Sequence, residues 1–351
     1  MSQPRRYLAV SLLSALIAVG LWYWMRPAPT ITPPAVNHSY SKALEQAHNG
    51  MPGAARVLYQ QLTRTDLSDI RRANLHAELP NYPSPQALKL ADADLQNASP
   101  VVRKAAIQSI AGLVPNAQRT LLLGPLLEDP EQSVRFAAAS ALLGLSPDEQ
   151  GLYFGPLQQV VDEYERNLKT QPDDPQAQGQ LARLYLHEGQ LDEAQAALEK
   201  VTTLDPENLK AVVAQIDLLD KRGKTDQARE LLARQLEAHP DSAYLQHALG
   251  IWLLNHGQTE YALLGLTKAV ELEPDNSEYR YKLAIALHDL EQLEPAQRQL
   301  EELLQRQPAN RKARLLLIRY WKEAGQLQNV QVLLAQLEQQ NPDDPALQQG
   351  L

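Results

Sequence analysis

Proline recurs every 34 residues through the second half of this 351-residue chain, and this period constrains the fold more than any other feature of the sequence. The prolines in register are Pro172, Pro206, Pro240, Pro274, Pro308 and Pro342. Glycine keeps the same period at Gly189, Gly223, Gly257 and Gly325, with Glu291 in the missing place. A unit this short cannot bury a core by itself, so such units must stack into an array.

The residues between these prolines predict two helices per unit. In the first unit, Leu181, Ala182 and Tyr185 share one helical face, and Gly189 begins a turn. Ala194 is small, which lets the second helix cross close to the first. The proline closes the unit because it cannot continue a helix. This pattern resembles the tetratricopeptide repeat (TPR). The frame is completed by Ala194, Ala228, Ala262, Ala296 and Val330, and by Leu198, Leu232, Leu266, Leu300 and Leu334.

A second period, of 32 residues, precedes the first. The pairs in register are Ile70-Arg71, Val102-Arg103 and Val134-Arg135. The segments "SPVVRKAAIQSIAGL" and "EQSVRFAAASALLGL" resemble HEAT repeats, in which the valine and arginine open the second helix of each pair. We expect Arg71, Arg103 and Arg135 to be structural, bonding acidic or backbone groups of the neighbouring turn.

The two periods predict an all-α chain made of two α-solenoids. HEAT-like helical repeats occupy residues 41–150, a joining helix lies in 151–172, and an array of five TPR units fills 173–351. The joining segment "PLQQVVDEYERNLKTQP" reads as one amphipathic helix that connects the solenoids or caps the TPR array. The tail "NPDDPALQQGL" is too short for a full capping helix, so we expect residues past 345 to fray.

Residues 7–25 predict a transmembrane anchor, with a cytoplasmic tail at 1–6 and a proline-rich linker at 26–40. The nineteen residues "YLAVSLLSALIAVGLWYWM" carry no charge, and a helix of that length spans roughly 28 Å, close to the bilayer hydrocarbon thickness. A cleaved signal peptide is the alternative, but the run ends in aromatic residues without a small-residue cleavage site. The arginine bias predicts a single-pass protein of the bacterial inner membrane with its bulk in the periplasm.

The order of HEAT-like repeats, joining helix and TPR array resembles the carboxy-terminal half of a family of periplasmic multihaem cytochromes c. The segments carrying this resemblance include "LLGPLLEDPEQSVRFAAASALLGL" and "QLARLYLHEGQLDEAQAALEK". The haem half of that family carries Cys-x-x-Cys-His sites, whereas this chain has no cysteine, so no haem ligand can be carried over. The resemblance implies a periplasmic setting and a partner involved in electron transfer.

The sequence predicts no enzyme, no metal site and no cofactor. It lacks a Gly-rich phosphate loop, a His-Glu-x-x-His motif and a Gly-x-Ser-x-Gly motif, and its eight histidines are scattered. Its formal net charge of −9 makes it a poor ligand for a phosphate backbone, so we expect no nucleic-acid partner.

The remaining candidate site is the concave groove, which the first helix of each repeat lines in TPR arrays. The candidate partner-binding residues are Arg183, His187, Lys210, Asp217, Tyr244, His247, Asn255, Tyr281, Lys282, His288 and Arg319. Aromatic and arginine side chains commonly anchor partners, although these residues could also be merely solvated. The carboxylate-clamp pattern of chaperone-binding TPR domains does not fit, so an Asp-terminated chaperone tail is not expected.

We therefore expect a membrane-tethered scaffold or adaptor that binds a protein partner through its TPR groove. Its role would be the assembly or organisation of an envelope or respiratory, cytochrome-linked complex. The alternative is a stoichiometric, non-catalytic structural subunit of a larger membrane redox enzyme.

Overall fold

The structure is a computed structural model that describes residues 39–348. The helices described below belong to the compact unit Tyr40–Leu351, one of two units in the chain. The predicted anchor at 7–25, the tail at 1–6 and nearly all of the linker at 26–40 lie outside the described residues. Between residues 39 and 348, no helix is long and apolar enough to cross a bilayer.

The described residues are helical throughout and contain no strand, which confirms the all-α prediction for this part of the chain. The region before the TPR array has short helices, several of them extended by a 3-10 turn. They are α2 Tyr40–His48, α3 Ala54–Leu62, α4 Asp69–Glu78, η1 Leu79–Asn81, α5 Pro85–Asp94, α6 Pro100–Leu113, α7 Asn116–Leu123, η2 Gly124–Glu128, α8 Gln132–Leu142, α9 Pro147–Gln150 and η3 Gly151–Tyr153. One longer helix, α10 Phe154–Lys169, follows in the predicted joining segment.

Five helix pairs then follow at the predicted spacing. They are α11 Pro175–His187 with α12 Leu191–Leu204, α13 Leu209–Lys221 with α14 Thr225–Ala238, α15 Ala243–Asn255 with α16 Thr259–Leu272, α17 Ser277–Asp289 with α18 Leu293–Arg306, and α19 Arg311–Glu323 with α20 Leu327–Gln340. A last short helix, α21 Pro345–Gln348, ends the described part of the chain, where the sequence predicted fraying.

The turn inside each pair requires a left-handed backbone. Gly189, Gly223, Gly257 and Gly325 have φ angles of 73°, 71°, 69° and 70°. Glu291 takes the same place with φ 57°, and it is the only residue other than glycine with positive φ between residues 39 and 348. A side chain in this conformation costs about 1–2 kcal/mol, which is the physical reason for the glycine period.

The periodic alanines lie where the paired helices cross. Ala194, Ala228, Ala262 and Ala296 are each 0% exposed, and Val330 is 2% exposed. A larger side chain at these crossings would push the helices apart, because protein interiors are already close-packed. The predicted role of these positions is therefore confirmed.

The arginines of the 32-residue period are structural, with one exception. Arg103 donates to the carbonyl of Asn97 at 2.7 Å and to Asp129 at 2.8 Å. Arg135 donates to the carbonyl of Asp129 at 2.8 Å and pairs with Glu163. In the first unit the neighbouring Arg72 makes these contacts.

Arg72 donates to Asp94 at 2.6 Å and to the carbonyl of Arg64 at 2.8 Å. Arg71 is exposed and lies over the ring of Tyr40, 5.3 Å from its centroid, so the prediction for Arg71 was wrong by one residue. Helix α4 begins at Asp69, and the arginine that contacts Asp94 of the next helix is Arg72, one position after the place that the 32-residue period indicates.

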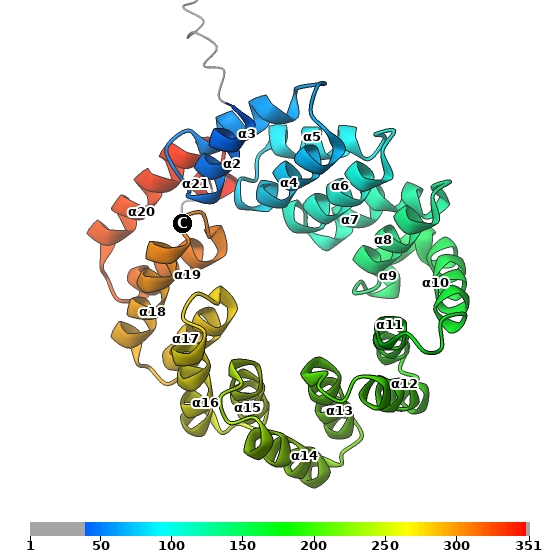
Figure 1. Ribbon diagram of the computed structural model, residues 1–351. Helices are drawn as coiled ribbons and strands as arrows, with labels where there is room; N and C mark the ends of the chain where they lie inside the picture. The colour runs from blue at the N-terminus through cyan, green and yellow to red at the C-terminus, as the bar shows by residue number, and fades with distance from the viewer. Residues whose placement is uncertain (1–38, 349–351) are drawn as a thin grey trace, which may run out of the picture. The chain divides into compact units, whose positions relative to one another are not determined.

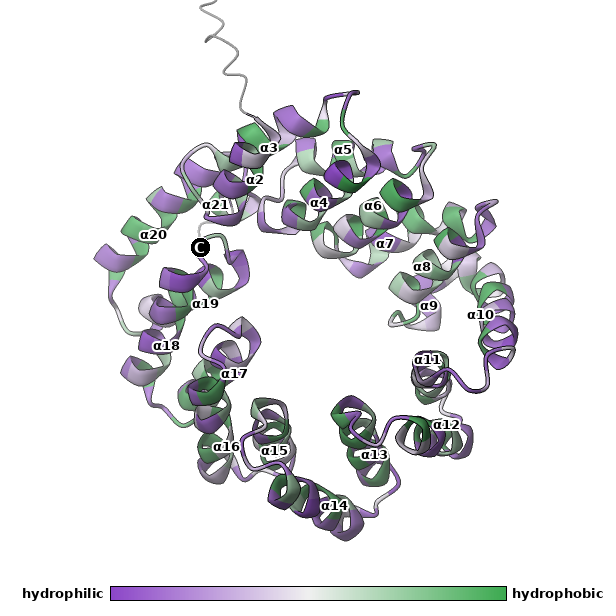
Figure 2. Ribbon diagram, in the orientation of Figure 1, coloured by the Kyte–Doolittle hydropathy of each residue, from purple (hydrophilic) through white to green (hydrophobic). Residues whose placement is uncertain are grey.

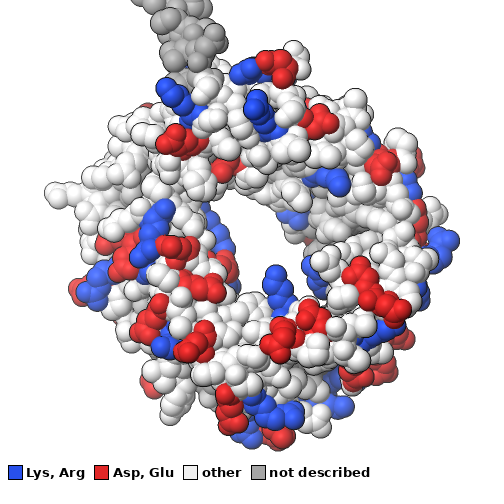
Figure 3. Space-filling view, in the orientation of Figure 1, with Lys and Arg blue, Asp and Glu red and all other residues white. Residues whose placement is uncertain are grey.

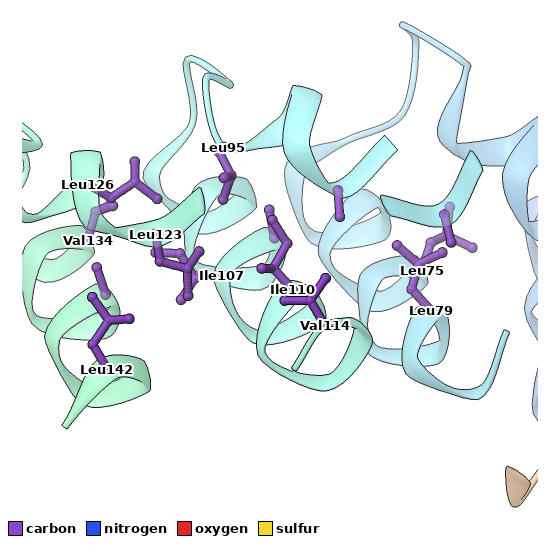
Figure 4. Packing of buried hydrophobic residues seen from close by; sticks show 14 of the residues in the cluster. Leu75, Leu79, Leu95, Ile107, Ile110, Val114, Leu123, Leu126, Val134 and Leu142 are labelled. Atoms are coloured by element: carbon purple, nitrogen blue, oxygen red, sulfur yellow. The ribbon is translucent and has the colours of Figure 1, made fainter. Parts of the chain in front are cut away.

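The core is a series of packed layers between neighbouring helices. Apolar residues recur on every helix around the unit instead of gathering in one centre (Figure 2). The largest cluster extends from α2 to α10 and includes Leu184 of α11; in Figure 4 its members Leu75, Ile107, Leu123 and Leu142 lie between successive helices. Three further clusters continue through the helix pairs, as expected for a solenoid whose units contact their neighbours.

The last helices of this unit pack against its first ones, so the solenoid closes into a ring (Figure 1). The Gly53 amide donates to the carbonyl of Gln339 at 2.7 Å, and the Asn341 side chain donates to the carbonyl of Pro83 at 2.8 Å. Ala309, from the last TPR unit, belongs to the same apolar cluster as α2 to α10. We call the packing of residues 308–346 against residues 47–84 the closure contact.

Buried polar groups surround the closure contact. The Tyr59 hydroxyl donates to the carbonyl of Tyr82 at 2.6 Å and accepts from the Ser84 hydroxyl at 2.9 Å. Burial raises the pKa of Tyr59 to about 12, and the nearby carboxylates of Asp343 and Asp344 act in the same direction. A phenol held neutral in this way keeps its proton for the hydrogen bond.

The tail after α20 is fixed by an ion pair. Arg311 holds the fully buried Asp344 through two hydrogen bonds of 2.7 Å each, and Ala346 is 3% exposed. The hydrogen bonds of Pro83 and Gly53 with Asn341 and Gln339 show that the first helices of the unit cover the end of the array. The sequence predicted no full capping helix for this end.

Candidate functional site

All eleven predicted groove residues lie on the first helix of a pair. These helices, α11, α13, α15, α17 and α19, face the middle of the ring, and the second helices lie outside them (Figure 1). We call this surface the inner wall. Figure 3 shows an opening through the unit, with several lysine and arginine side chains at its edge.

One cavity in the inner wall, of about 470 Å³, lies between α11 and α13. Its lining includes the small residues Gly179, Ala211 and Ala214, together with Tyr244 of α15. Arg183 and Lys210 also line it and have exposed side chains. The small lining residues allow a polypeptide backbone to approach closely, and the two exposed cations can pair with its acidic groups.

A second cavity, of about 420 Å³, adjoins the first and shares Gln180 and Arg183 with it. Its other side is formed by Ser140 and Leu143 from the region before the TPR array. The predicted residue His187 lines it, and Tyr164 of the joining helix donates to Gln180 beside it. Arg183 is therefore placed between two hollows, which the sequence did not indicate.

Two of the predicted histidines contact the next repeat. The ring of His247 stacks on Tyr279, with 4.7 Å between centroids, and burial lowers the pKa of His247. The ring of His288 stacks on Tyr320 at 3.9 Å, and its Nε2 lies 2.6 Å from Glu323. These stacking contacts join neighbouring repeats, so the main role of both histidines is to pack the inner wall together.

The remaining predicted residues fall into two groups. Asp217 and Asn255 are exposed on α13 and α15 and line neither of the cavities described above. Lys282 lies 3.8 Å from Glu278, and Lys312 approaches the same carboxylate at 3.8 Å. Lys312 also lies over the Tyr281 ring, 4.1 Å from its centroid, in a cation–π contact.

A third cavity, of about 420 Å³, contains Tyr281 and Arg319 and was not predicted. Pro80, Asn81 and Gly112 form its opposite side. These three residues come from η1 and α6, near the other end of the unit, and reach α19 because the ring is closed. Sequence patterns could not have found them, since repeat periodicity reports contacts between neighbouring units.

The three inner-wall cavities carry positive charge. Their lining residues include Arg183, Lys210, Arg311, Lys312 and Arg319, and no aspartate or glutamate. This contrasts with the whole chain, which has 42 acidic and 33 basic side chains. The inner wall is thus suited to acidic or polar polypeptide surfaces. Over residues 39–348, no group of three or more histidine, aspartate or glutamate side chains could hold a metal ion.

Comparisons with known proteins agree with this architecture. A model of the tetratricopeptide repeat family matches residues 157–215 and 187–250, which confirms the TPR prediction for this part of the chain. The first match begins inside the joining helix α10. No curated protein matches the sequence. The HEAT-like assignment of residues 41–150 and the resemblance to multihaem cytochromes stay predictions.

Two solved structures that match this chain are those of yeast Tom70 and of TTC0263. Yeast Tom70 superposes with a TM-score of 0.52 at 14% identity, covering 98% of this chain and 71% of that one. TTC0263, a TPR protein of Thermus thermophilus, superposes with a TM-score of 0.41 at 23% identity, covering 58% of this chain and 98% of that one. The likeness to Tom70 shows that the chain has the fold of an α-helical solenoid.

Proposed function

We propose that this protein is a scaffold that binds a protein partner on the inner wall of its ring. In this proposal the apolar segment at residues 7–25 tethers the ring to the bacterial inner membrane, and the helical unit lies in the periplasm. The partner belongs to an envelope or respiratory complex that the scaffold helps to assemble or organise.

The observation that carries the proposal is the pair of adjoining cavities around Arg183. Arg183 and Lys210 have no hydrogen bond or ion pair with another residue in the 39–348 range, although Tyr164 lies near enough to feel the arginine's charge. They differ in this from Arg222 at the end of α13, which pairs with Asp192 of α12. Unpaired cations beside hollows with small lining residues favour a binding surface.

The closure contact affects how a partner reaches the inner wall. A closed ring admits an extended segment through its opening, or a folded partner after the closure contact has separated. Tethering to the membrane raises the local concentration of a membrane partner, so moderate affinity in the wall suffices.

Partner capture tests the proposal. The full chain, extracted in detergent, should enrich the same protein from envelope extracts repeatedly, and Arg183→Gln with Lys210→Gln should reduce that enrichment by about tenfold, as expected when two charged contacts are lost. The matched control replaces two exposed arginines of outer helices, Arg234→Gln and Arg298→Gln, and removes the same charge. Equal capture by both double variants would contradict a role for the inner wall.

The stoichiometry of the captured complex separates the two roles considered from the sequence. An assembly factor should recover its partner substoichiometrically, with the partner lost in high salt. A permanent subunit would co-purify in fixed proportion through high salt.

The membrane assignment has its own test. Protease added to intact spheroplasts should digest the helical unit, while a tag at residues 1–6 stays protected. Full release of the chain by alkaline carbonate would contradict a transmembrane anchor.

A further inference from the structure

The third inner-wall cavity differs from the others because the closure contact creates it. Pro80 and Asn81 of η1 and Gly112 of α6 form one side. Helix α19 forms the other, with Lys312 and Arg319 among its lining residues. We call this hollow of about 420 Å³ the seam cavity. Its size lies within the usual range of ligand sites.

The charges in the seam cavity are unbalanced. Three cations line it, and no carboxylate does. Arg311 is neutralised by its two hydrogen bonds to Asp344. Lys312 has only a loose approach of 3.8 Å to Glu278, with 64% of its side chain exposed.

Arg319 is exposed, and it makes no hydrogen bond or ion pair with any residue that the structure describes. Its charge acts to lower the pKa of the Tyr281 hydroxyl, although burial raises that pKa overall, and Tyr281 also lines the cavity with Lys312 over the face of its ring. The planar guanidinium therefore retains its donors for an anion from outside the chain. A carboxylate accepts two parallel hydrogen bonds from such a group.

The other lining residues argue for a polypeptide over a small ion. Leu315, Leu316 and Pro80 give the cavity an apolar part that an inorganic anion would not use. The Asn81 amide has one long hydrogen bond, 3.5 Å, to Glu78, and so retains capacity to bond a backbone carbonyl. Gly112 packs against Pro80: a Cβ atom there would lie 2.9 Å from Pro80 Cβ and Cγ, so glycine allows these two parts of the lining to meet.

We infer that the seam cavity binds an acidic segment of a protein partner, with Arg319 and Lys312 pairing with its carboxylates and Asn81 contacting it from the opposite end of the unit. The inference rests on the proposed function and names the chemistry of the partner. Because both ends of the unit contact the segment, its binding stabilises the closed ring, and separation of the closure contact releases it.

A labelled peptide tests this inference with the full chain in detergent micelles. The probe is a fluorescein-labelled decapeptide of alternating Glu and Leu, and its Gln–Leu counterpart is the neutral control. Fluorescence anisotropy should show binding of the acidic probe that weakens as salt is added, and at least about tenfold weaker binding of the neutral one. Equal affinity for the two peptides would overturn the inference.

Variants locate the binding. The double variant Arg319→Gln with Lys312→Gln should bind the acidic probe about tenfold or more weakly than the natural chain. The control variant Arg234→Gln with Arg298→Gln, on the outer helices, should bind it with unchanged affinity. Asn81→Glu adds a carboxylate to the cavity that Lys312 and Arg319 line, and it should lower the affinity for the acidic probe by a similar factor. The neutral Asn81→Gln should leave that affinity unchanged. Unchanged affinity in Asn81→Glu or in the Arg319 and Lys312 variant would contradict the assignment.

Two further arms complete the design. Inorganic phosphate should displace the peptide no better than chloride does at equal ionic strength. Specific displacement by phosphate would mean a small-anion site and would overturn the inference.

Partner capture by the Arg319 and Lys312 variant separates the two proposals. If capture depends on Arg183 and Lys210 and these seam variants still bind the acidic peptide fully, the proposed function stands and the seam inference fails.

Discussion

The side chain of Asn341 donates to the backbone carbonyl of Pro83 at 2.8 Å, across 258 positions of the chain. Asn341 is 1% exposed, so this bond lies inside the closure contact. A linear solenoid leaves its terminal layers uncovered and needs capping elements at both ends. Here each end covers the other, and the wall that faces the ring's opening gains residues from both.

Gly50 should be more sensitive to substitution than other glycines with positive φ. A Cβ atom at Gly50 would lie 2.7 Å from the Pro308 carbonyl carbon, whereas a Cβ at Gly189 would meet nothing within 4 Å. Both replacements by alanine strain the backbone by about 1–2 kcal/mol. Gly50→Ala should lose about 1–3 kcal/mol more, because it overpacks the closure contact. Urea unfolding measures the difference, and equal losses would argue against a closed ring.

Arg72 and Arg71 should differ sharply, although they are neighbours in sequence. Arg72 bonds Asp94, which is 3% exposed, so Arg72→Gln leaves a buried carboxylate short of a partner and should cost about 3 kcal/mol. Arg71 is exposed over Tyr40, and Arg71→Gln should cost under about 0.5 kcal/mol. Chemical unfolding of the two variants checks this; a costly Arg71→Gln would restore the register that the sequence predicted.

Asp94 should make the free energy of unfolding depend on pH in the acidic range. Burial acts to raise the pKa of this carboxyl, but hydrogen bonds from His76 and Arg72 lower it below its ordinary value. Its contribution is therefore present above the unfolded pKa, about 3.9, and is lost as pH falls through the lower folded value. Asp94→Asn should be less stable than the natural chain at pH 7 by about 3 kcal/mol, and the difference should shrink below pH 4. Unfolding curves between pH 7 and pH 3 measure it, and a constant difference would contradict this account.

Glu291→Gly should stabilise the fourth TPR unit. Glu291 has φ 57° in the turn where the other four repeats have glycine, and its side chain is exposed. Relief of the left-handed strain should exceed the entropy that glycine adds to the unfolded chain, giving a net gain of about 0.5–1 kcal/mol. The comparison is with Glu294→Gly on α18, which should destabilise by about 1 kcal/mol because it lies within a helix. A loss in Glu291→Gly would mean that its side chain has a role of its own.

The sequence predicted the helix pairs of the second half closely. A proline that ends each unit, a glycine that must adopt positive φ and an alanine that must fit a crossing are all demands of local geometry. Such demands repeat at the period of the unit, so they can be read from one sequence. The resemblance to TPR units placed the candidate residues on the first helix of each pair. The anchor at residues 7–25 was likewise inferred from composition, and it stays a prediction.

In the TPR array, the sequence by itself indicated which residues form helices and which helices pair, and the resemblance to TPR units implied which helix of each pair faces inward. Only the tertiary structure decided that the array closes, that Arg72 replaces Arg71, and that Asn81 and Arg319 line the same cavity. The reason is that a repeat pattern encodes contacts between adjacent units. Ring closure depends on the sum of small rotations between all the units, and no single unit carries that sum.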